Sequence, residues 1–190
     1  MTAPHLTLAS ASPRRRELLA RLGVVPDAIV PADIDETPCR GELPRDYALR
    51  MAREKAMALE AEGFVLGGDT VVAAGRRILP KTEDEGSARA CLELLSGRRH
   101  RVLSAIALKT PDGSLQERLS ESVVRFKRFS DQEIAAYLAS DEWRGKAGGY
   151  AIQGAAEGLV AWLGGSHSGV MGLPLYETRS LLKSAGFPIG

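Results

Sequence analysis

The sequence predicts an α/β protein built on a mixed sheet. Apolar runs typical of buried strands, over residues 6–9 and 64–74, alternate with segments such as 83–95, where apolar residues recur at helical spacing. Residues 100–109 and 115–129 are rich in β-forming residues and enclose a Pro-Asp-Gly-Ser turn, which predicts an antiparallel hairpin. Strands and helices that alternate around such a hairpin indicate a mixed sheet. The 190 residues fit a single domain.

The first strand leads through a serine-rich turn into a helix. Ser12 suits the N-cap of this helix, Pro13 its first position and Gly23 its end. A loop with several prolines then precedes a second helix, expected over residues 44–62. In the strand that follows, over residues 64–74, a pair of glycines predicts a break.

The C-terminal part supplies three further elements. Ser130 caps a short helix over residues 131–138. A glycine-rich stretch over residues 145–158 precedes a strand over 159–163, and the last helix is expected over 175–184.

Composition excludes several classes of protein. With 25 Lys and Arg against 24 Asp and Glu, the formal net charge of +1 argues against a stable nucleic-acid partner, although local basic clusters can hold a small anion. The apolar runs are too short for a membrane span and residues 1–5 show no secretory leader, so we expect no membrane partner and a cytoplasmic location. Cys39 and Cys91 lack the spacing of a disulfide framework or a zinc site.

The junction of the first strand and helix carries Ser10, Arg14 and Arg15. The first turn of a helix offers free backbone N–H groups and the positive end of the dipole, so it favours acidic residues over arginine. Two arginines there indicate a missing anion. Phosphate suits hydroxyl, N–H and guanidinium donors together. The alternative is an exposed basic turn with a serine cap.

Four residues in the middle of the chain add charged or polar groups beside apolar segments. Lys55 falls within the apolar arc of the second helix, which makes it a cation lining a cleft or a lysine that extends past its neighbours to solvent. Asp69 and Thr70 follow an apolar run, where α/β sheets present catalytic groups. The partner of Asp69 could be a divalent cation, a water molecule or a turn N–H. Lys81 follows a further apolar pair.

Two loops complete the candidates. Asp33, Asp35 and Glu36 form an acidic cluster that either binds metal or is solvated. Residues 148–154 contain three glycines, which let a flat ligand approach the backbone, and the Gln153 amide suits the edge of a base; the alternative is a surface loop. The sequence has neither a Walker A motif nor GxGxxG, which argues against P-loop kinases and Rossmann dehydrogenases.

Taken in order along the chain, these segments resemble the Maf family. The matching segments are Leu8-Ala9-Ser10-Ala11-Ser12-Pro13-Arg14-Arg15, Asp35-Glu36-Thr37, Ala52-Arg53-Glu54-Lys55-Ala56, Gly68-Asp69-Thr70, Lys81, Leu94-Leu95-Ser96-Gly97, Gly148-Gly149-Tyr150-Ala151-Ile152-Gln153-Gly154 and Gly172-Leu173-Pro174. The resemblance implies a nucleoside triphosphate pyrophosphatase with a fold similar to inosine triphosphatases, a mixed, twisted sheet in two lobes with a central cleft. It also implies a divalent cation, Mg²⁺ or Mn²⁺, and a homodimer.

The resemblance further implies a site. It makes Asp69 the catalytic acceptor that activates water and places Glu36 and Asp69 near the metal. The triphosphate would be lined by Ser10, Arg14, Arg15, Lys55 and Lys81. Arg14, Thr70 and Gln153 match the residues that mark the family's dTTP and UTP subgroup.

Three other functions stay open on the sequence. The same chemistry could act on another base, such as that of 7-methyl-GTP or of a modified pyrimidine nucleotide, because an amide can rotate to suit several donor and acceptor patterns. A non-enzymatic regulator of septum formation is a second reading, although it would not need an acid among cations. An RNA-binding protein using residues 14–16 and 98–101 is a third, disfavoured by the near-neutral charge and the 5% aromatic content.

Overall fold

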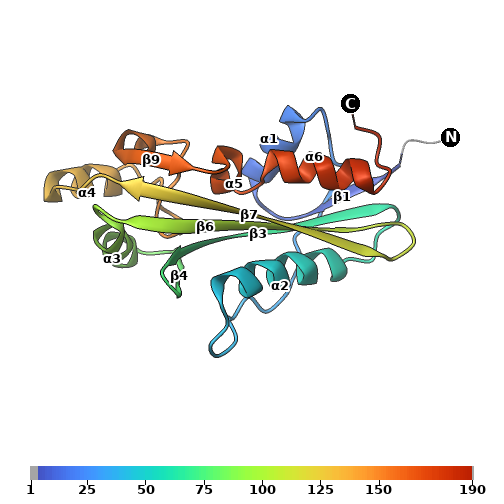
Figure 1. Cartoon of the computed structure of the whole chain (residues 1–190), viewed down its shortest axis with the longest axis horizontal. Coiled ribbons are helices and arrows are strands. Elements are labelled where there is room, and N and C mark those ends of the chain that lie inside the picture. Colours follow the sequence, from blue (N-terminus) through green and yellow to red (C-terminus); the bar gives the residue numbers. More distant parts are fainter. Residues whose placement is uncertain (1–3, 190) are drawn as a thin grey trace.

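The computed structural model describes residues 4–189, and its helices and strands alternate along the chain as expected (Figure 1). The elements are β1 (Leu6–Ala9), α1 (Pro13–Arg21), β2 (Ala28–Ile29), α2 (Pro44–Met57), β3 (Phe64–Ala74), β4 (Arg77–Leu79), β5 (Lys81–Thr82), α3 (Glu85–Leu95), β6 (Arg99–Lys109), β7 (Leu115–Phe126), α4 (Asp131–Leu138), β8 (Lys146–Ala147), a 3-10 helix (Ala155–Leu159), β9 (Val160–Gly164), α5 (His167–Met171) and α6 (Leu175–Ser184). Residues 1–3, which carry part of the expectation about a leader, lie outside the described chain. Within residues 4–189, no helix has the length and apolar character needed to cross a membrane.

The main sheet is mixed, as the sequence predicts. Its strands lie in the order β2-β1-β3-β6-β7-β9, with β4 paired to β3. β1 runs parallel to β2 and β3, whereas the pairs from β3 to β9 are antiparallel. The long arms β6 and β7 form the expected hairpin. A second sheet, of two short strands, pairs β5 with β8.

Helices cover both faces of the long strands. α2 lies along one face, where Met51 and Ala52 belong to a buried cluster with Val71 and Leu103. α5 and α6 lie on the opposite side of the strands in Figure 1, over a larger cluster that includes Leu8, Ile106 and Leu181.

The edge of β3 is open in its middle. β1 ends where Ala9 pairs with Gly67, and β4 begins where Leu79 pairs with Val72. In the described chain, residues 68–71 therefore have a strand partner only on the β6 side. Because successive side chains of a strand point to opposite faces, residues from both faces reach this opening.

The observed elements correct two expectations, the end of α2 and the break in β3. α2 ends at Met57 and not near residue 62, and the Leu59 carbonyl beyond its end accepts a hydrogen bond from Lys109 Nζ at 2.9 Å. The glycine pair does not break β3, which runs unbroken through Gly67. A Cβ on Gly67 would lie 2.4 Å from the Ala52 carbonyl oxygen, so this glycine allows α2 to approach the sheet closely. The prediction that Ser12 is the N-cap of α1 is confirmed, although its side chain makes no capping bond.

Candidate active site

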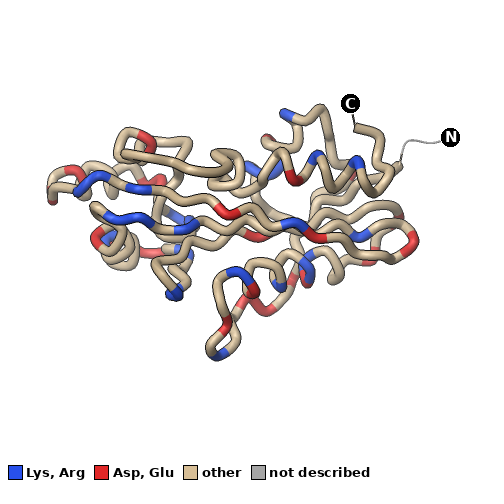
Figure 2. Tube along the Cα trace, viewed as in Figure 1, with Lys and Arg blue, Asp and Glu red and all other residues tan. Residues whose placement is uncertain are grey.

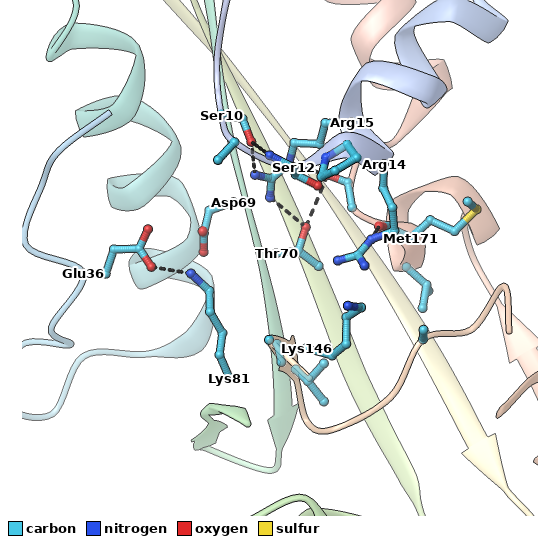
Figure 3. Close-up of a pocket in the computed structure, with 18 of the residues that line it drawn as sticks. Ser10, Ser12, Arg14, Arg15, Glu36, Asp69, Thr70, Lys81, Lys146 and Met171 are labelled. Atoms are coloured by element: carbon cyan, nitrogen blue, oxygen red, sulfur yellow. Dashed lines mark hydrogen bonds and ion pairs between the residues drawn. The ribbon is translucent and has the colours of Figure 1, made fainter. Parts of the chain in front are cut away.

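A cavity of about 430 Å³ lies at the opening in β3. The residues that line it come from the turn after β1, the start of α1, the loop before α2, α2 itself, β3, the β5–β8 pair, the segment after β8 and the segment before α6 (Figure 3). They include Ser10, Arg14, Arg15, Glu36, Lys55, Asp69, Thr70, Lys81, Lys146, Gln153 and Met171. All nine residues of the site that the family resemblance implies therefore line one cavity.

The α2 side of the cavity holds two carboxylates and two lysines. Lys55 Nζ lies 2.8 Å from Asp69 Oδ1 and 2.7 Å from Glu36 Oε1, and Lys81 Nζ lies 2.6 Å from Glu36 Oε2. Lys55 and Asp69 are buried, with 6% and 5% of their surface exposed. Lys55 is therefore a cation lining the cleft and not a lysine that reaches solvent.

Asp69 is exposed to the cavity from a position in its strand that the sequence does not predict. It was expected just after a strand, but it lies in the middle of β3. It is accessible because β1 ends two residues earlier along β3, opposite Gly67. The end of a neighbouring strand, and not the end of its own, exposes the carboxylate.

Glu36 is held in its ionised form by the two lysines. Partial burial alone would raise its pKa, but hydrogen bonds from Lys55 and Lys81, together with their charges, lower the pKa from 4.5 to about 2. The Tyr47 hydroxyl donates to the Glu36 backbone carbonyl at 2.7 Å and fixes this part of the loop to α2. Burial, followed by the charge of Asp69, raises the pKa of Tyr47, so the hydroxyl keeps its proton.

The pKa of Glu36 predicts a pH dependence of stability. Since the pKa is lower in the folded than in the unfolded chain, the stabilising contribution of Glu36 is present above pH 4.5 and is lost as the pH falls towards 2. We expect Glu36→Gln to reduce the free energy of unfolding at pH 6 and to have a much smaller effect at pH 2, where Glu36 becomes protonated in the folded chain. Denaturant unfolding of both proteins across this range measures the difference. A difference that stays constant with pH would contradict the ion pairs of Glu36.

Arg15 joins the first helix to β3 and to the loop before α6. Its Nε donates to the Gly172 carbonyl at 2.9 Å, its Nη1 donates to Ser10 Oγ at 3.0 Å, and its Nη2 lies 3.4 Å from Thr70 Oγ1. Burial lowers the pKa of Arg15, and the charge of Asp69 opposes that shift. These contacts exclude the alternative of an exposed basic turn.

Arg14 and Lys146 face the cavity from opposite walls (Figure 3). Arg14 Nε donates to the Met171 carbonyl at 3.3 Å, and Lys146 Nζ to the Arg144 carbonyl at 2.8 Å. Burial lowers the pKa of Lys146, and the positive charge of Arg14 lowers it further. Because these hydrogen bonds go to neutral carbonyl groups, the charges of both cations are available for an anion between them.

The glycine-rich segment is a tight, largely buried turn. Gly148 and Gly149 have φ of 68° and 72°, and a Cβ on Gly148 would lie 2.8 Å from the Val72 side chain. The next residue, Tyr150, is buried and its hydroxyl lies 2.8 Å from His100 Nε2. Gln153 follows at the cavity wall and is exposed, so its amide is free to meet a ligand.

Sequence reasoning missed Lys146. It lies on β8, where Thr82 pairs with Lys146 and Lys81 with Ala147, so one small sheet carries both lysines to the cavity. Because this pairing joins residues more than 60 positions apart, no local pattern could reveal it.

The residues of the acidic loop have different surroundings. Glu36 lines the cavity, whereas Asp35 is exposed and accepts a hydrogen bond from the Thr37 backbone N–H.

The carboxylates suit a metal that the substrate helps to hold. Among residues 4–189, no group of three or more His, Cys, Asp or Glu side chains gathers as a metal site. Asp69 and Glu36 share Lys55 between them. Mg²⁺ is commonly held by one or two carboxylates together with substrate phosphates and water. The pair therefore fits a cation bound with a phosphorylated ligand and not one held by the protein alone.

The mixed α/β fold, with carboxylates and cations around one cleft, belongs to the class of proteins whose sites suit phosphorylated ligands. The family model described as Maf-like protein matches residues 5–185. The chain belongs to the Maf-like family.

Relatives of high sequence identity agree with this assignment. A dTTP/UTP pyrophosphatase of Novosphingobium aromaticivorans is 65% identical over 189 residues, which cover 98% of this chain and 94% of that protein. A dTTP/UTP pyrophosphatase of Rhodospirillum rubrum is 64% identical over 97% of this chain and 90% of that protein. A HAM1 protein structure from Coxiella burnetii has a TM-score of 0.46 to this chain at 16% identity, over 95% of this chain and 99% of that one.

Proposed function

We propose that the protein is a nucleoside triphosphate pyrophosphatase that hydrolyses dTTP and UTP to the nucleoside monophosphate and pyrophosphate. The observation that carries this proposal is the buried Asp69 carboxylate, 2.8 Å from Lys55 Nζ, beside a cavity lined by further cations. The names of the relatives at 64% and 65% identity support the same substrates. We propose that residues 1–190 act as one domain.

In the proposed reaction, Asp69 accepts a proton from the attacking water. The water oxygen forms a bond to the α-phosphorus, and the bond from that phosphorus to the oxygen bridging to the β-phosphate breaks, with pyrophosphate leaving. Lys55 holds the Asp69 carboxylate and stabilises negative charge that develops next to it. A divalent cation, Mg²⁺ or Mn²⁺, held by Glu36, Asp69 and phosphate oxygens, would neutralise phosphate charge when bound.

The remaining residues divide between the triphosphate and the nucleoside. Ser10, Arg14, Arg15, Lys55 and Lys81 would bind phosphate oxygens, and Lys146 joins them because it faces Arg14 across the cavity. Thr70 and Gln153, with Arg14, would select the base. A homodimer, the absence of a stable nucleic-acid partner and a cytoplasmic location stay predictions.

The proposal is tested by the products formed from a panel of nucleotides. Purified protein is incubated with dTTP, UTP, CTP, GTP and 7-methyl-GTP, with Mg²⁺, with Mn²⁺ and with chelator, and pyrophosphate is measured separately from orthophosphate. We expect pyrophosphate, chiefly from dTTP and UTP, and only with the metal. Turnover of 7-methyl-GTP instead would keep the chemistry and overturn the substrate. No turnover by folded protein would favour a binding regulator of septum formation.

Lys146 gives a second prediction. Replacing Lys146 by methionine removes the charge that faces Arg14, and we expect KM for UTP to rise about tenfold, as for the loss of one charge-assisted hydrogen bond, with a small change in kcat. Lys109→Met is the control, because Lys109 binds the Leu59 carbonyl away from the cavity. Equal KM values for the two variants would remove Lys146 from the phosphate site.

A further inference from the structure

Ser104 is a buried hydroxyl beside the site that the proposed reaction does not use. It lies on β6 opposite Thr70 in the β3–β6 register and is 1% exposed. Its Oγ donates to the Gly169 carbonyl oxygen at 2.5 Å. A serine hydroxyl has one proton, and a carbonyl can only accept. In the 2.9 Å contact between Ser104 Oγ and Thr70 Oγ1, Thr70 is therefore the donor.

This assignment determines whether the Thr70 hydroxyl faces the cavity as a hydrogen-bond donor or as an acceptor. The Gly172 carbonyl also lies near Thr70 Oγ1, but at 3.4 Å, beyond the usual range for O–H···O bonds. Arg15 Nη2 donates towards the same oxygen. With its proton directed at Ser104, the Thr70 hydroxyl presents only lone pairs to a ligand in the cavity.

We propose that Ser104 is a positioning residue that holds Thr70 as a hydrogen-bond acceptor, so that this part of the cavity takes a hydrogen-bond donor of the nucleoside and disfavours a phosphate oxygen. The inference rests on the proposed function. Two donor groups are shared by dTTP and UTP: the N3–H of the base, where cytosine has an acceptor nitrogen, and the sugar 3′-hydroxyl. A site that leaves a polar group unpaired discriminates strongly against the wrong ligand.

The experiment measures two preferences in the wild type and in Ser104→Ala. One is kcat/KM for UTP over CTP, and the other is kcat/KM for dTTP over 3′-deoxythymidine triphosphate. In Ser104→Ala only the 3.4 Å contact still orients the Thr70 proton, so one preference should fall about tenfold. A fall in the first preference identifies the base as the donor, and a fall in the second identifies the sugar. If neither preference falls, the inference is wrong.

A double-mutant cycle separates positioning from a general structural effect. Thr70→Val removes the hydroxyl through which Ser104 acts, so adding Ser104→Ala to Thr70→Val should change neither preference further. A further fall in the double variant would overturn the inference. Ser120→Ala is the matched control, because Ser120 is a buried serine that pairs with Ser104 on β7. It should keep both preferences at the wild-type values.

A binding measurement and a second variant distinguish failure of this inference from failure of the proposed function or of folding. The preferences are also measured as dissociation constants by calorimetry with the same four nucleotides. A wild type that binds UTP but does not hydrolyse it would overturn the proposed function and still report on Ser104. If Ser104→Ala does not fold, Ser104→Cys replaces it, since a thiol of similar size is only a weak donor.

Discussion

Replacing Asp69 by asparagine is expected to reduce kcat for UTP by about a hundredfold to ten-thousandfold, the range that a general base contributes. The amide keeps the size of the carboxylate but cannot accept the proton of the attacking water. Lys55 keeps its ion pair with Glu36 at 2.7 Å, so the variant should fold. Single-turnover release of pyrophosphate measures the loss directly.

The control for this prediction is Asp35→Asn. Asp35 is an exposed carboxylate whose bond to the Thr37 backbone closes a turn outside the cavity. It should leave kcat unchanged. If Asp69→Asn kept wild-type turnover in folded protein, another group would have to accept the proton.

Replacing Lys55 by methionine is expected to lower the free energy of unfolding by about 3 kcal/mol, as for other broken buried ion pairs. The substitution leaves the Asp69 carboxylate, whose side chain is 7% exposed, without its positive partner and close to Glu36. Activity should fall with stability, because the cation beside the reacting carboxylate is lost. Urea unfolding at pH 7 measures the change in stability.

Two comparisons show whether this effect comes from the buried charge. Lys81→Met removes the other lysine of the cluster, but Lys81 has 52% of its side chain exposed, so the loss of stability should stay within about 1 kcal/mol. The double variant Lys55→Met with Asp69→Asn removes both members of the buried pair and should recover much of the lost stability. A urea unfolding midpoint of Lys55→Met equal to that of the wild type would contradict this account.

Much of the fold could be predicted because its signals are local. The final helix has its predicted bounds at Leu175–Ser184. Ser130 caps α4 as predicted, and Glu133 completes a capping box there. Two segments rich in β-forming residues around a Pro-Asp-Gly-Ser turn predicted the hairpin of β6 and β7, although β7 ends at Phe126 and not at 129. Each of these features depends on neighbours within a few positions of the chain.

The geometry of the site could not be predicted in the same way. The exposure of Asp69 depends on where β1 ends beside β3, and the approach of Lys146 depends on the pairing of β8 with β5. The proton of Thr70 is set by Ser104, a partner 34 positions away. Each feature joins segments that are distant in the sequence. The sequence therefore identifies the types of residue in the site but not their positions relative to one another.

The opening in the edge of β3 allows the range of substrates to change separately from the hydrolytic group. Asp69 belongs to the α2 face with Lys55, whereas Thr70 belongs to the other face with Arg15 and Ser104. The two faces are packed by separate hydrophobic clusters. Substitutions behind Thr70 can therefore retune which nucleotide is accepted while the hydrolytic group stays in place, and one chain can acquire new specificity without rebuilding its chemistry.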